Sequence, residues 1–255
     1  MANILYKREN GVSYMTLNRP KNYNALDVET LKDMANIVKG IEQNDDSIVV
    51  IGGEGKAFCA GGDITMMGQK GQEEFYAELM DLISETTLRL YGLDKIVITA
   101  VQGSAAGLGL SFALNSDFII ADKEARFGML FAGIGLVPDG GGHFFLQERM
   151  GTHEAKKFIW GLEQVKGEKA VELGLADILV DDIGEGINEL IQKLKASPLK
   201  AILASKGIFH EEKKKELTAI LNSEKEFQLQ MMQTTDHKEG ITAFLEKRQP
   251  KFIGK

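Results

Sequence analysis

Several residue types that mark particular protein classes are scarce in this sequence of 255 residues. It contains a single cysteine, Cys59, which excludes an internal disulfide and a cysteine-based metal cluster and fits a reducing compartment. It has no run of about 18 continuous apolar residues, the length that a membrane-spanning helix needs. Residues 1–11 also lack the apolar segment of a signal peptide. We therefore expect a cytoplasmic protein that has no membrane partner.

Basic residues are outnumbered by acidic ones, 30 against 37, which leaves a formal net charge of -7. A protein that binds nucleic acid needs a positively charged surface, so this balance argues against a nucleic acid partner. Proline is rare, with 4 residues, whereas glycine is abundant, with 28, so many backbone positions can make tight turns or close approaches. Because 44% of the residues are hydrophobic, the chain can bury the core of one large domain. These proportions are typical of an enzyme built around tight loops.

Apolar segments and helical periods alternate along the first part of the chain. Residues 3–8 and 12–18 are predicted as two strands joined at Asn10 and Gly11, a pair that supplies the positive φ of a tight hairpin turn. Residues 27–43 have the spacing of an amphipathic helix, with Asp27 as its N-cap. Further strands are predicted at residues 48–51, 96–101, 118–121 and 178–180. Further helices are predicted at residues 72–91, from the turn at 103–109 to about Asn115, and after Gly142. The alternation predicts an α/β protein with mainly parallel strands.

The end of the chain has a different pattern. Residues 197–249 show only helical periods and many charges, and Ser197 and Pro198 mark the start of this stretch. We therefore predict two regions, an α/β core over residues 1–196 and a helical C-terminal region over residues 197–255.

Two loops that follow apolar strands, residues 52–63 and 103–109, carry more glycine than a turn requires. The first lacks the glycine and the hydroxyl residue that a phosphate-binding P-loop places around its lysine. The second spaces its glycines differently from a dinucleotide-binding loop. Small residues after a strand let a ligand approach free backbone N–H groups, and two such groups can form an oxyanion hole. The alternative is that the glycines only allow a helix to pack closely on a strand.

Ordered motifs across nearly the whole chain carry a family resemblance. Residues 56–63 (KAFCAGGD), 100–107 (AVQGSAAG) and 134–142 (IGLVPDGGG) lie between 18–20 (NRP) and 239–248 (EGITAFLEKR). In this order they resemble the enoyl-CoA hydratase/isomerase, or crotonase, superfamily. The resemblance implies an α/β fold with a crotonase-like spiral of ββα units. It also implies that the helical C-terminal region, residues 197–255, assembles the chain into a homotrimer or a dimer of trimers.

The same resemblance implies the chemistry. The substrate is expected to be an acyl-CoA thioester of fatty acid or related acyl-CoA metabolism. No metal or other cofactor is implied, because coenzyme A enters as part of the substrate. The backbone N–H groups of Ala60 and Leu108 are predicted to form the oxyanion hole for the thioester carbonyl, where each donor can contribute ~3 to 4 kcal/mol. Four residues are predicted to contact coenzyme A, the last two from one face of a C-terminal helix: Lys56, Ala57, Phe244 and Lys247.

The acid and base positions favour one reaction of this family over another. The positions that hold two glutamates in hydratases are Ser111 and Phe131 here, and neither side chain is a carboxylate base. With Gly107 and Phe127, these two residues are predicted to line the substrate pocket. Asp139 matches the acid of isomerases that resemble those of the phenylacetate pathway. One carboxylate can take a proton from C2 and return it at C4, so we predict conversion of a 3-enoyl-CoA to a 2-enoyl-CoA.

Three alternatives stay open at this point. Asp139 precedes a glycine run that is predicted to begin a helix, so it could serve only as an N-cap. The chain could be a hydratase or decarboxylase that uses other groups. It could also be a non-catalytic acyl-CoA-binding relative, in which the lost glutamates signal lost chemistry. The phenylalanines between residues 127 and 145 fit either a plain core or an apolar acyl pocket.

Overall fold

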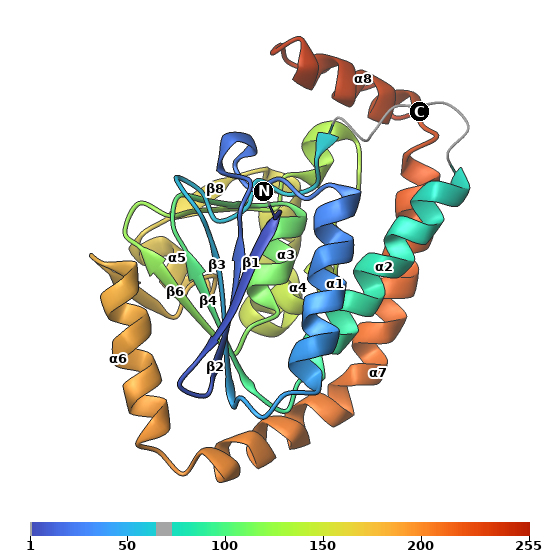
Figure 1. Ribbon diagram of the computed structural model, residues 1–255. Coiled ribbons are helices and arrows are strands. Elements are labelled where there is room, and N and C mark those ends of the chain that lie inside the picture. Colours follow the sequence, from blue (N-terminus) through green and yellow to red (C-terminus); the bar gives the residue numbers. More distant parts are fainter. Residues whose placement is uncertain (1, 65–72) are drawn as a thin grey trace.

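Two sheets form the centre of the computed structural model, which describes residues 2–64 and 73–255 (Figure 1). The strands are β1 (Ile4–Glu9), β2 (Val12–Leu17), β3 (Ile48–Gly53), β4 (Ile96–Val101), β5 (Ser104–Ala106), β6 (Phe118–Asp122), β7 (Arg126–Gly128), β8 (Gln164–Lys166) and β9 (Ile178–Val180). Within the described residues the larger sheet has the order β1-β2-β3-β4-β6-β9 and the smaller one β5-β7-β8. In the larger sheet β1 and β2 pair antiparallel, and the other pairs are parallel.

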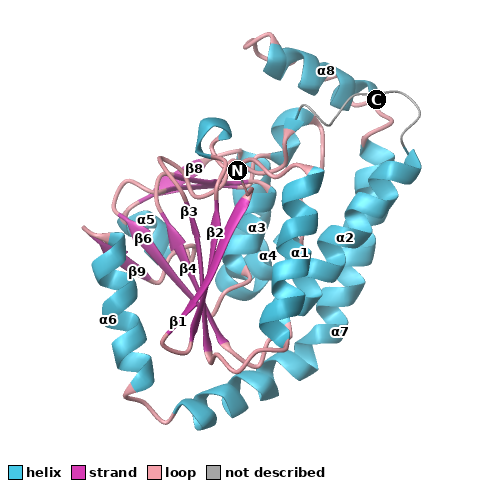
Figure 2. Ribbon diagram, in the orientation of Figure 1, coloured by secondary structure: helices cyan, strands magenta, loops and turns pink. Residues whose placement is uncertain are grey.

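Helices cover both faces of the larger sheet (Figure 2). They are α1 (Val28–Glu42), α2 (Glu73–Tyr91), α3 (Leu108–Leu114), α4 (Gly142–Gly161), α5 (Glu168–Glu172), α6 (Ile183–Lys195), α7 (Leu199–Met231) and α8 (Thr235–Leu245), with the 3-10 helices η1 (Pro20–Asn22) and η3 (Phe131–Ile134). Helices α1 to α4 lie on the side of one face, with the later turns of α7 packed on α2 and α4, whereas α6 packs against the other face. The α/β fold and the helical C-terminal region predicted from the sequence are both present.

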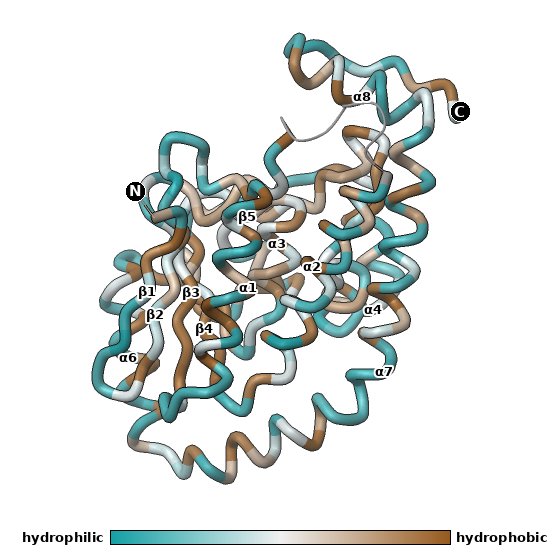
Figure 3. Tube along the Cα trace, turned by 45° about the vertical axis from the view of Figure 1, so that its right-hand side comes forward, coloured by the Kyte–Doolittle hydropathy of each residue, from teal (hydrophilic) through white to brown (hydrophobic). Residues whose placement is uncertain are grey.

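The central strands are apolar on both faces because helices cover both sides of the sheet (Figure 3). Val49 and Ile51 of β3 belong to the cluster beneath α1 to α4, and Ile48 and Val50 of the same strand belong to the cluster beneath α6. All six residues of β4 are buried. The continuous apolar runs seen in the sequence therefore mark strands with two covered faces.

Local signals in the sequence placed several elements correctly. Asn10 and Gly11 adopt φ values of 51° and 74° at the turn between β1 and β2, as the predicted hairpin requires. Asp27 is the N-cap of α1, where its side chain accepts a 2.8 Å hydrogen bond from the N–H of Thr30. The predicted strand at residues 178–180 coincides with β9.

Other elements were missed or placed differently. The turn predicted at 103–109 contains the unpredicted strand β5, whereas the helix that this turn was predicted to open is present as α3 from Leu108. Strands β7 (RFG) and β8 (QVK) were not predicted, because neither contains a continuous apolar run like the one that marked β9 (ILV). Gln72, predicted to begin the helix that corresponds to α2, lies outside the described residues.

The C-terminal region follows the body of the molecule and then leaves it. In Figure 1, helix α7 begins below α6 and runs along α2. It is followed by α8, which projects at the top of the view. Helix α8 contacts η3 closely, since a Cβ atom added at Gly240 would lie 2.7 Å from the Cα of Ile134. His237 of α8 also places Nδ1 2.9 Å from the carbonyl oxygen of Ile134. None of the helices in the described residues has the length and apolarity to cross a membrane.

Candidate active site

A cavity of about 360 Å³ opens where the two glycine loops meet helices α2, α3 and α7. Most of its lining is apolar, and Asp139 and Gln228 add polar side chains. The lining residues are Leu26, Leu31, Ala60, Gly61, Gly62, Ile64, Tyr76, Leu79, Met80, Ile83, Ala106, Gly107, Leu108, Leu130, Phe131, Gly133, Ile134, Leu136, Asp139, Leu162, Gln228, Met232 and Phe244. A mostly apolar cavity with a few placed polar groups is typical of a small-molecule site.

The two glycine loops approach each other because Gly61 has no side chain. A Cβ atom at Gly61, whose φ is 99°, would lie 2.9 Å from the carbonyl oxygen of Ala106 and 3.6 Å from the backbone nitrogen of Leu108. Leu108 is the first residue of α3, so its N–H group precedes the hydrogen-bond ladder of that helix. Among the described residues the N–H group of Leu108 makes no hydrogen bond, and the residue lines the cavity, as the motifs indicated.

The second predicted donor, Ala60, is wrong. Its N–H group already donates a 3.0 Å hydrogen bond to the carbonyl oxygen of Tyr23. Gly62 is the better donor: Leu26 bonds Gly61 and Asp63 on one side of this segment, so the N–H of Gly62 points to the other side. Among the described residues this N–H group makes no hydrogen bond. The motif located the loop, but only the backbone path shows which N–H group is free.

Asp139 lies in the cavity wall with an exposed fraction of 6%. Its Oδ2 accepts a 3.0 Å hydrogen bond from Nε2 of Gln228, and its Oδ1 has no partner among the described residues. Burial first, and then the negative charge of Glu224, raise the pKa of Asp139 to about 7, while the hydrogen bond from Gln228 opposes this rise. A carboxyl group with such a pKa can both accept and return a proton near neutral pH.

The N-cap interpretation of Asp139 is also wrong. The N-cap of α4 is Gly141, and no side chain of its own segment caps the helix. Glu224 of α7 takes that place: its carboxylate accepts hydrogen bonds from the N–H groups of Gly141 at 2.7 Å and His143 at 3.1 Å. Nδ1 of His143 lies 2.8 Å from the same carboxylate. The positive end of α4 is thus occupied by Glu224, and Asp139 is left for another role.

The predicted pocket residues divide into two groups. Gly107 and Phe131 line the cavity, and a Cβ atom at Gly107 would lie 3.6 Å from the ring of Phe131. Ser111 and Phe127 do not line it, and both are 0% exposed. Phe127 is the central residue of β7 and belongs to the core, so its prediction as a pocket residue is wrong.

Ser111 lies directly behind the segment that follows Asp139. A Cβ atom at Gly142 would lie 2.9 Å from the hydroxyl oxygen of Ser111, and one at Gly140 would lie 3.2 Å from its Cβ. The hydroxyl group has no partner among the described residues. Ser111 therefore supports the wall of the cavity from behind and does not line it.

The residues predicted to contact coenzyme A lie at two places. Lys56 is exposed and Ala57 is buried, near the middle of the first glycine loop. Phe244 of α8 lines the cavity while 56% of it remains exposed. Lys247 is exposed and has a φ of 55°, two residues beyond the end of α8, so it does not share a helix face with Phe244 as predicted. Contact of these residues with coenzyme A stays a prediction.

Sequence reasoning missed two functional candidates, Glu224 and Gln228. They lie 83 and 89 residues along the chain from the groups that they bind, Gly141 and Asp139. Their spacing of four residues places them on one face of a helix, which was the only available signal. Many charged residues of α7 share that spacing, so the pattern could not single them out.

Comparison with known proteins identifies the family. The family model described as enoyl-CoA hydratase/isomerase matches residues 7–255. YhaR of Bacillus subtilis (strain 168), named for both hydratase and isomerase, is 43% identical over 253 residues, which are 99% of each chain. The 1,2-epoxyphenylacetyl-CoA isomerase of Escherichia coli (strain K12) is 33% identical over 269 residues, which cover 100% of both chains.

A solved structure agrees with these sequence matches. The crystal structure of an enoyl-CoA hydratase from Mycobacterium avium subsp. paratuberculosis K-10 superposes with a TM-score of 0.90 at 28% identity and covers 99% of each chain. The similar proteins thus include a hydratase and an isomerase, and the matched fold extends through helix α7, which carries Glu224 and Gln228. The chain therefore belongs to the enoyl-CoA hydratase/isomerase family, the crotonase superfamily.

Proposed function

We propose that this enzyme converts a 3-enoyl-CoA to a 2-enoyl-CoA. The observation that carries the proposal is Asp139, a carboxyl group in the wall of an apolar cavity, one of whose oxygens has no partner among the described residues. The ionised carboxylate takes a proton from C2, and the electron pair of that C–H bond moves toward the thioester carbonyl. The resulting dienolate is reprotonated at C4 by the same carboxyl group, so no proton or electron is gained or lost overall.

The oxyanion formed in this reaction requires fixed donors. In our proposal the N–H groups of Gly62 and Leu108 hold the thioester oxygen, and each stabilises the developing charge by ~3 to 4 kcal/mol. Both residues line the same cavity as Asp139. The pKa of Asp139, raised to about 7 by burial and by Glu224, supports its role because a base near neutral pH is strong enough to abstract an activated proton.

Hydration is the competing reaction, and two residues disfavour it. It needs a water molecule that is held and activated by carboxylates. At the two matched positions the chain has Ser111, which lies outside the cavity lining, and Phe131, whose ring lines the cavity. An apolar ring at that place offers neither a hydrogen bond nor a base to water. These features support isomerisation over hydration.

We further propose how the substrate and the subunits are held. Lys56, Ala57, Phe244 and Lys247 would contact the coenzyme A part of the thioester. The region 197–255 would mediate assembly of a homotrimer or a dimer of trimers in the cytoplasm. Exposed apolar side chains of α8 support this assembly, since Phe244 and Leu245 are 56% and 62% exposed.

The experiment that tests the proposal supplies the purified protein with a 3-enoyl-CoA or a 2-enoyl-CoA and follows the products by chromatography and mass. Isomerisation leaves the mass unchanged, whereas hydration adds one water. We expect the 3-enoyl-CoA to be converted to its 2-enoyl isomer and the 2-enoyl-CoA to gain little water. Efficient formation of a 3-hydroxyacyl-CoA would establish the hydratase alternative. Tight binding of both thioesters without turnover would establish the non-catalytic alternative.

A further inference from the structure

Two buried side chains of helix α7 contact residues 139–143, the segment that contains Asp139. Glu224 and Gln228 are each 3% exposed and lie one helical turn apart. Glu224 binds the backbone that follows Asp139, and Gln228 binds the carboxyl group itself. One face of the C-terminal helical region is therefore part of the surroundings of the proposed base.

Gln228 decides which oxygen of Asp139 is free. Its Nε2 donates to Oδ2 at 3.0 Å, which leaves Oδ1 without a partner in the described chain. A neutral donor that holds one oxygen favours the ionised carboxylate and lowers its pKa. It also fixes the rotation of the carboxyl plane, so that the same oxygen remains available to the substrate.

Glu224 acts in the opposite direction on the same group. It caps the N-terminus of α4 through Gly141 and His143, which holds its carboxylate in place near Asp139. Two negative charges in a buried place repel, so Glu224 favours the protonated form of Asp139. Removal of this charge and removal of the Gln228 donor should therefore move the ionisation of Asp139 in opposite directions.

The other groups around Asp139 come from three helices. From α4, the ring of His143 contacts Glu224 at 2.8 Å, and a protonated ring would offset part of the charge of Glu224. From α2, the hydroxyl group of Thr87 donates to the carbonyl oxygen of Gly140 at 3.3 Å, and Tyr76 lines the cavity. From α3, Ser111 lies behind the segment. Among the described residues Glu224 is thus the charged group that acts most directly on Asp139.

We infer that Glu224 and Gln228 are positioning residues for Asp139, through which helix α7 sets both the orientation and the protonation of the proposed base. The inference rests on the proposed function, in which Asp139 moves the proton. It gives the C-terminal helical region a role in the chemistry in addition to its proposed role in assembly.

The test compares three variants by two measurements. Glu224→Gln removes the charge and keeps the size, and Gln228→Leu removes the donor. Glu226→Gln is the matched control, because Glu226 is an exposed residue of the same helix. The first measurement is the carboxyl band of Asp139 in infrared difference spectra, wild type minus Asp139→Asn, followed over pH without substrate. The second is the pH profile of kcat/KM for isomerisation.

Activity of the base requires its ionised form, so kcat/KM rises with pH through the ionisation of Asp139. We expect Glu224→Gln to move both titrations to lower pH, and Gln228→Leu to move both to higher pH, each by about one pH unit. Glu226→Gln should leave both unchanged. A thermal unfolding curve for each variant shows that the folded protein is being measured, and the double variant Glu224→Gln with Gln228→Leu should titrate between the two single variants.

Opposite shifts of the infrared titration support the inference, whereas unchanged titrations or shifts in one direction overturn it. The infrared measurement needs no turnover, so it separates this inference from the proposed function. If the infrared titrations shift as expected but the kcat/KM profiles do not, the residues tune Asp139 and Asp139 is not the base. That outcome would reject the proposed function, in which Asp139 is the base, but it would retain the inference that α7 sets the protonation of Asp139.

Discussion

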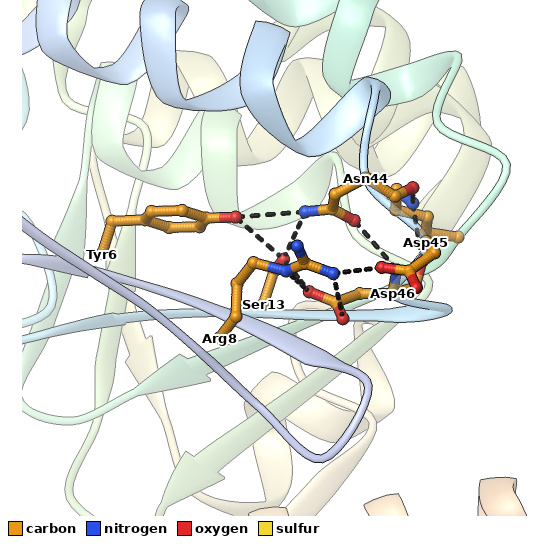
Figure 4. A network of polar contacts seen from close by, with 7 residues as sticks. Tyr6, Arg8, Ser13, Asn44, Asp45 and Asp46 are labelled. Atoms are coloured by element: carbon orange, nitrogen blue, oxygen red, sulfur yellow. Dashed lines mark hydrogen bonds and ion pairs between the residues drawn. The ribbon is translucent and has the colours of Figure 1, made fainter.

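Two aspartates of this chain are nearly equally buried but have opposite surroundings. Asp46 is 5% exposed, and Asp139 is 6% exposed. In the network of Figure 4, Asp46 accepts hydrogen bonds from Nε of Arg8 at 2.8 Å and from the hydroxyl group of Ser13 at 2.6 Å, and its other oxygen accepts from Nη2 of Arg8 at 3.0 Å. Among the described residues the carboxyl group of Asp139 accepts from one donor, Gln228, and lies near a like charge, Glu224.

The electrostatic consequences differ in sign. The hydrogen bonds and the positive charge of Arg8 lower the pKa of Asp46, although burial opposes them. Burial and Glu224 raise the pKa of Asp139 to about 7. Low exposure alone therefore does not decide how an acid behaves: the depth at which it lies and the partners that the fold supplies decide it together.

The two sites also differ in what they hold together. Arg8 lies in β1 and Ser13 in β2, so Asp46 ties the first hairpin to the loop before β3. Nζ of Lys95 donates to the carbonyl oxygen of Asp46 at 2.6 Å, which extends the network to the start of β4. The Asp46 network thus stabilises the sheet, whereas Asp139 contributes a reactive oxygen to a cavity.

The largest expected effect is on turnover, which should differ strongly between a variant of Asp139 and a variant of Asp46. Asp139→Asn keeps the size of the side chain and removes the base, so we expect kcat for isomerisation to fall by about 100- to 10,000-fold with little change in acyl-CoA affinity. Asp46→Asn should leave kcat per folded molecule near the wild-type value. Steady-state kinetics of both variants, corrected for the folded fraction, measure the contrast. Near-wild-type turnover by Asp139→Asn would falsify the assignment of the base.

For stability the contrast should be reversed: substitution of Asp46 should destabilise the protein, whereas substitution of Asp139 should not. Asp46→Ala removes the acceptor of the buried hydroxyl group of Ser13 and one of the two acidic partners of Arg8, which is 44% exposed and keeps Asp45. We therefore expect the free energy of unfolding to fall by about 1 to 2 kcal/mol. Asp139→Asn at pH 8 should raise it by about 1 to 2 kcal/mol, because it removes a buried charge that has an unfavourable neighbour. Urea unfolding followed by circular dichroism measures both changes. Destabilisation of similar size by both substitutions would remove the distinction between the two sites.

The pH dependence of stability should sharpen the comparison. The pKa of Asp139 is higher in the folded than in the unfolded chain, so its contribution is present at low pH and is lost as the pH rises through about 7. The pKa of Asp46 is lowered in the folded chain, so its contribution is present above the unfolded value and is lost as the pH falls. Between pH 5 and pH 8 the advantage of Asp139→Asn over wild type should therefore grow by about 1 kcal/mol or more. Unfolding free energies at several pH values test this, and an advantage that does not change with pH would contradict it.

The smallest expected effect concerns Lys247, whose charge would meet a coenzyme A phosphate in an exposed place. We expect Lys247→Glu to raise KM for the acyl-CoA by about three- to tenfold at low salt and by less at high salt, because exposed charges are screened. Its control is Lys238→Glu, a change of the same charge on a residue of α8. Equal KM values for wild type and Lys247→Glu at both salt concentrations would assign Lys247 to the solvated surface.

The sequence alone was sufficient where a signal is local. The hairpin turn at Asn10 and Gly11, the cap of α1 by Asp27 and the apolar runs of the central strands depend on neighbouring residues, and each is found as predicted. The ordered motifs located both glycine loops and drew attention to Asp139, because such segments need particular small or acidic residues at set spacings.

Other features of the site were decided only by the tertiary structure, because they depend on residues far apart in the sequence or on the direction in which one backbone N–H group points. It replaced Ala60 by Gly62 as the free backbone donor, since successive N–H groups of an extended segment point to opposite sides. It moved Phe127 into the core and brought Glu224 and Gln228 of α7 to the segment around Asp139. Residue types and spacings determine which elements form, but the packing of α7 across the molecule determines whether a buried aspartate is neutralised by donors or left as a base.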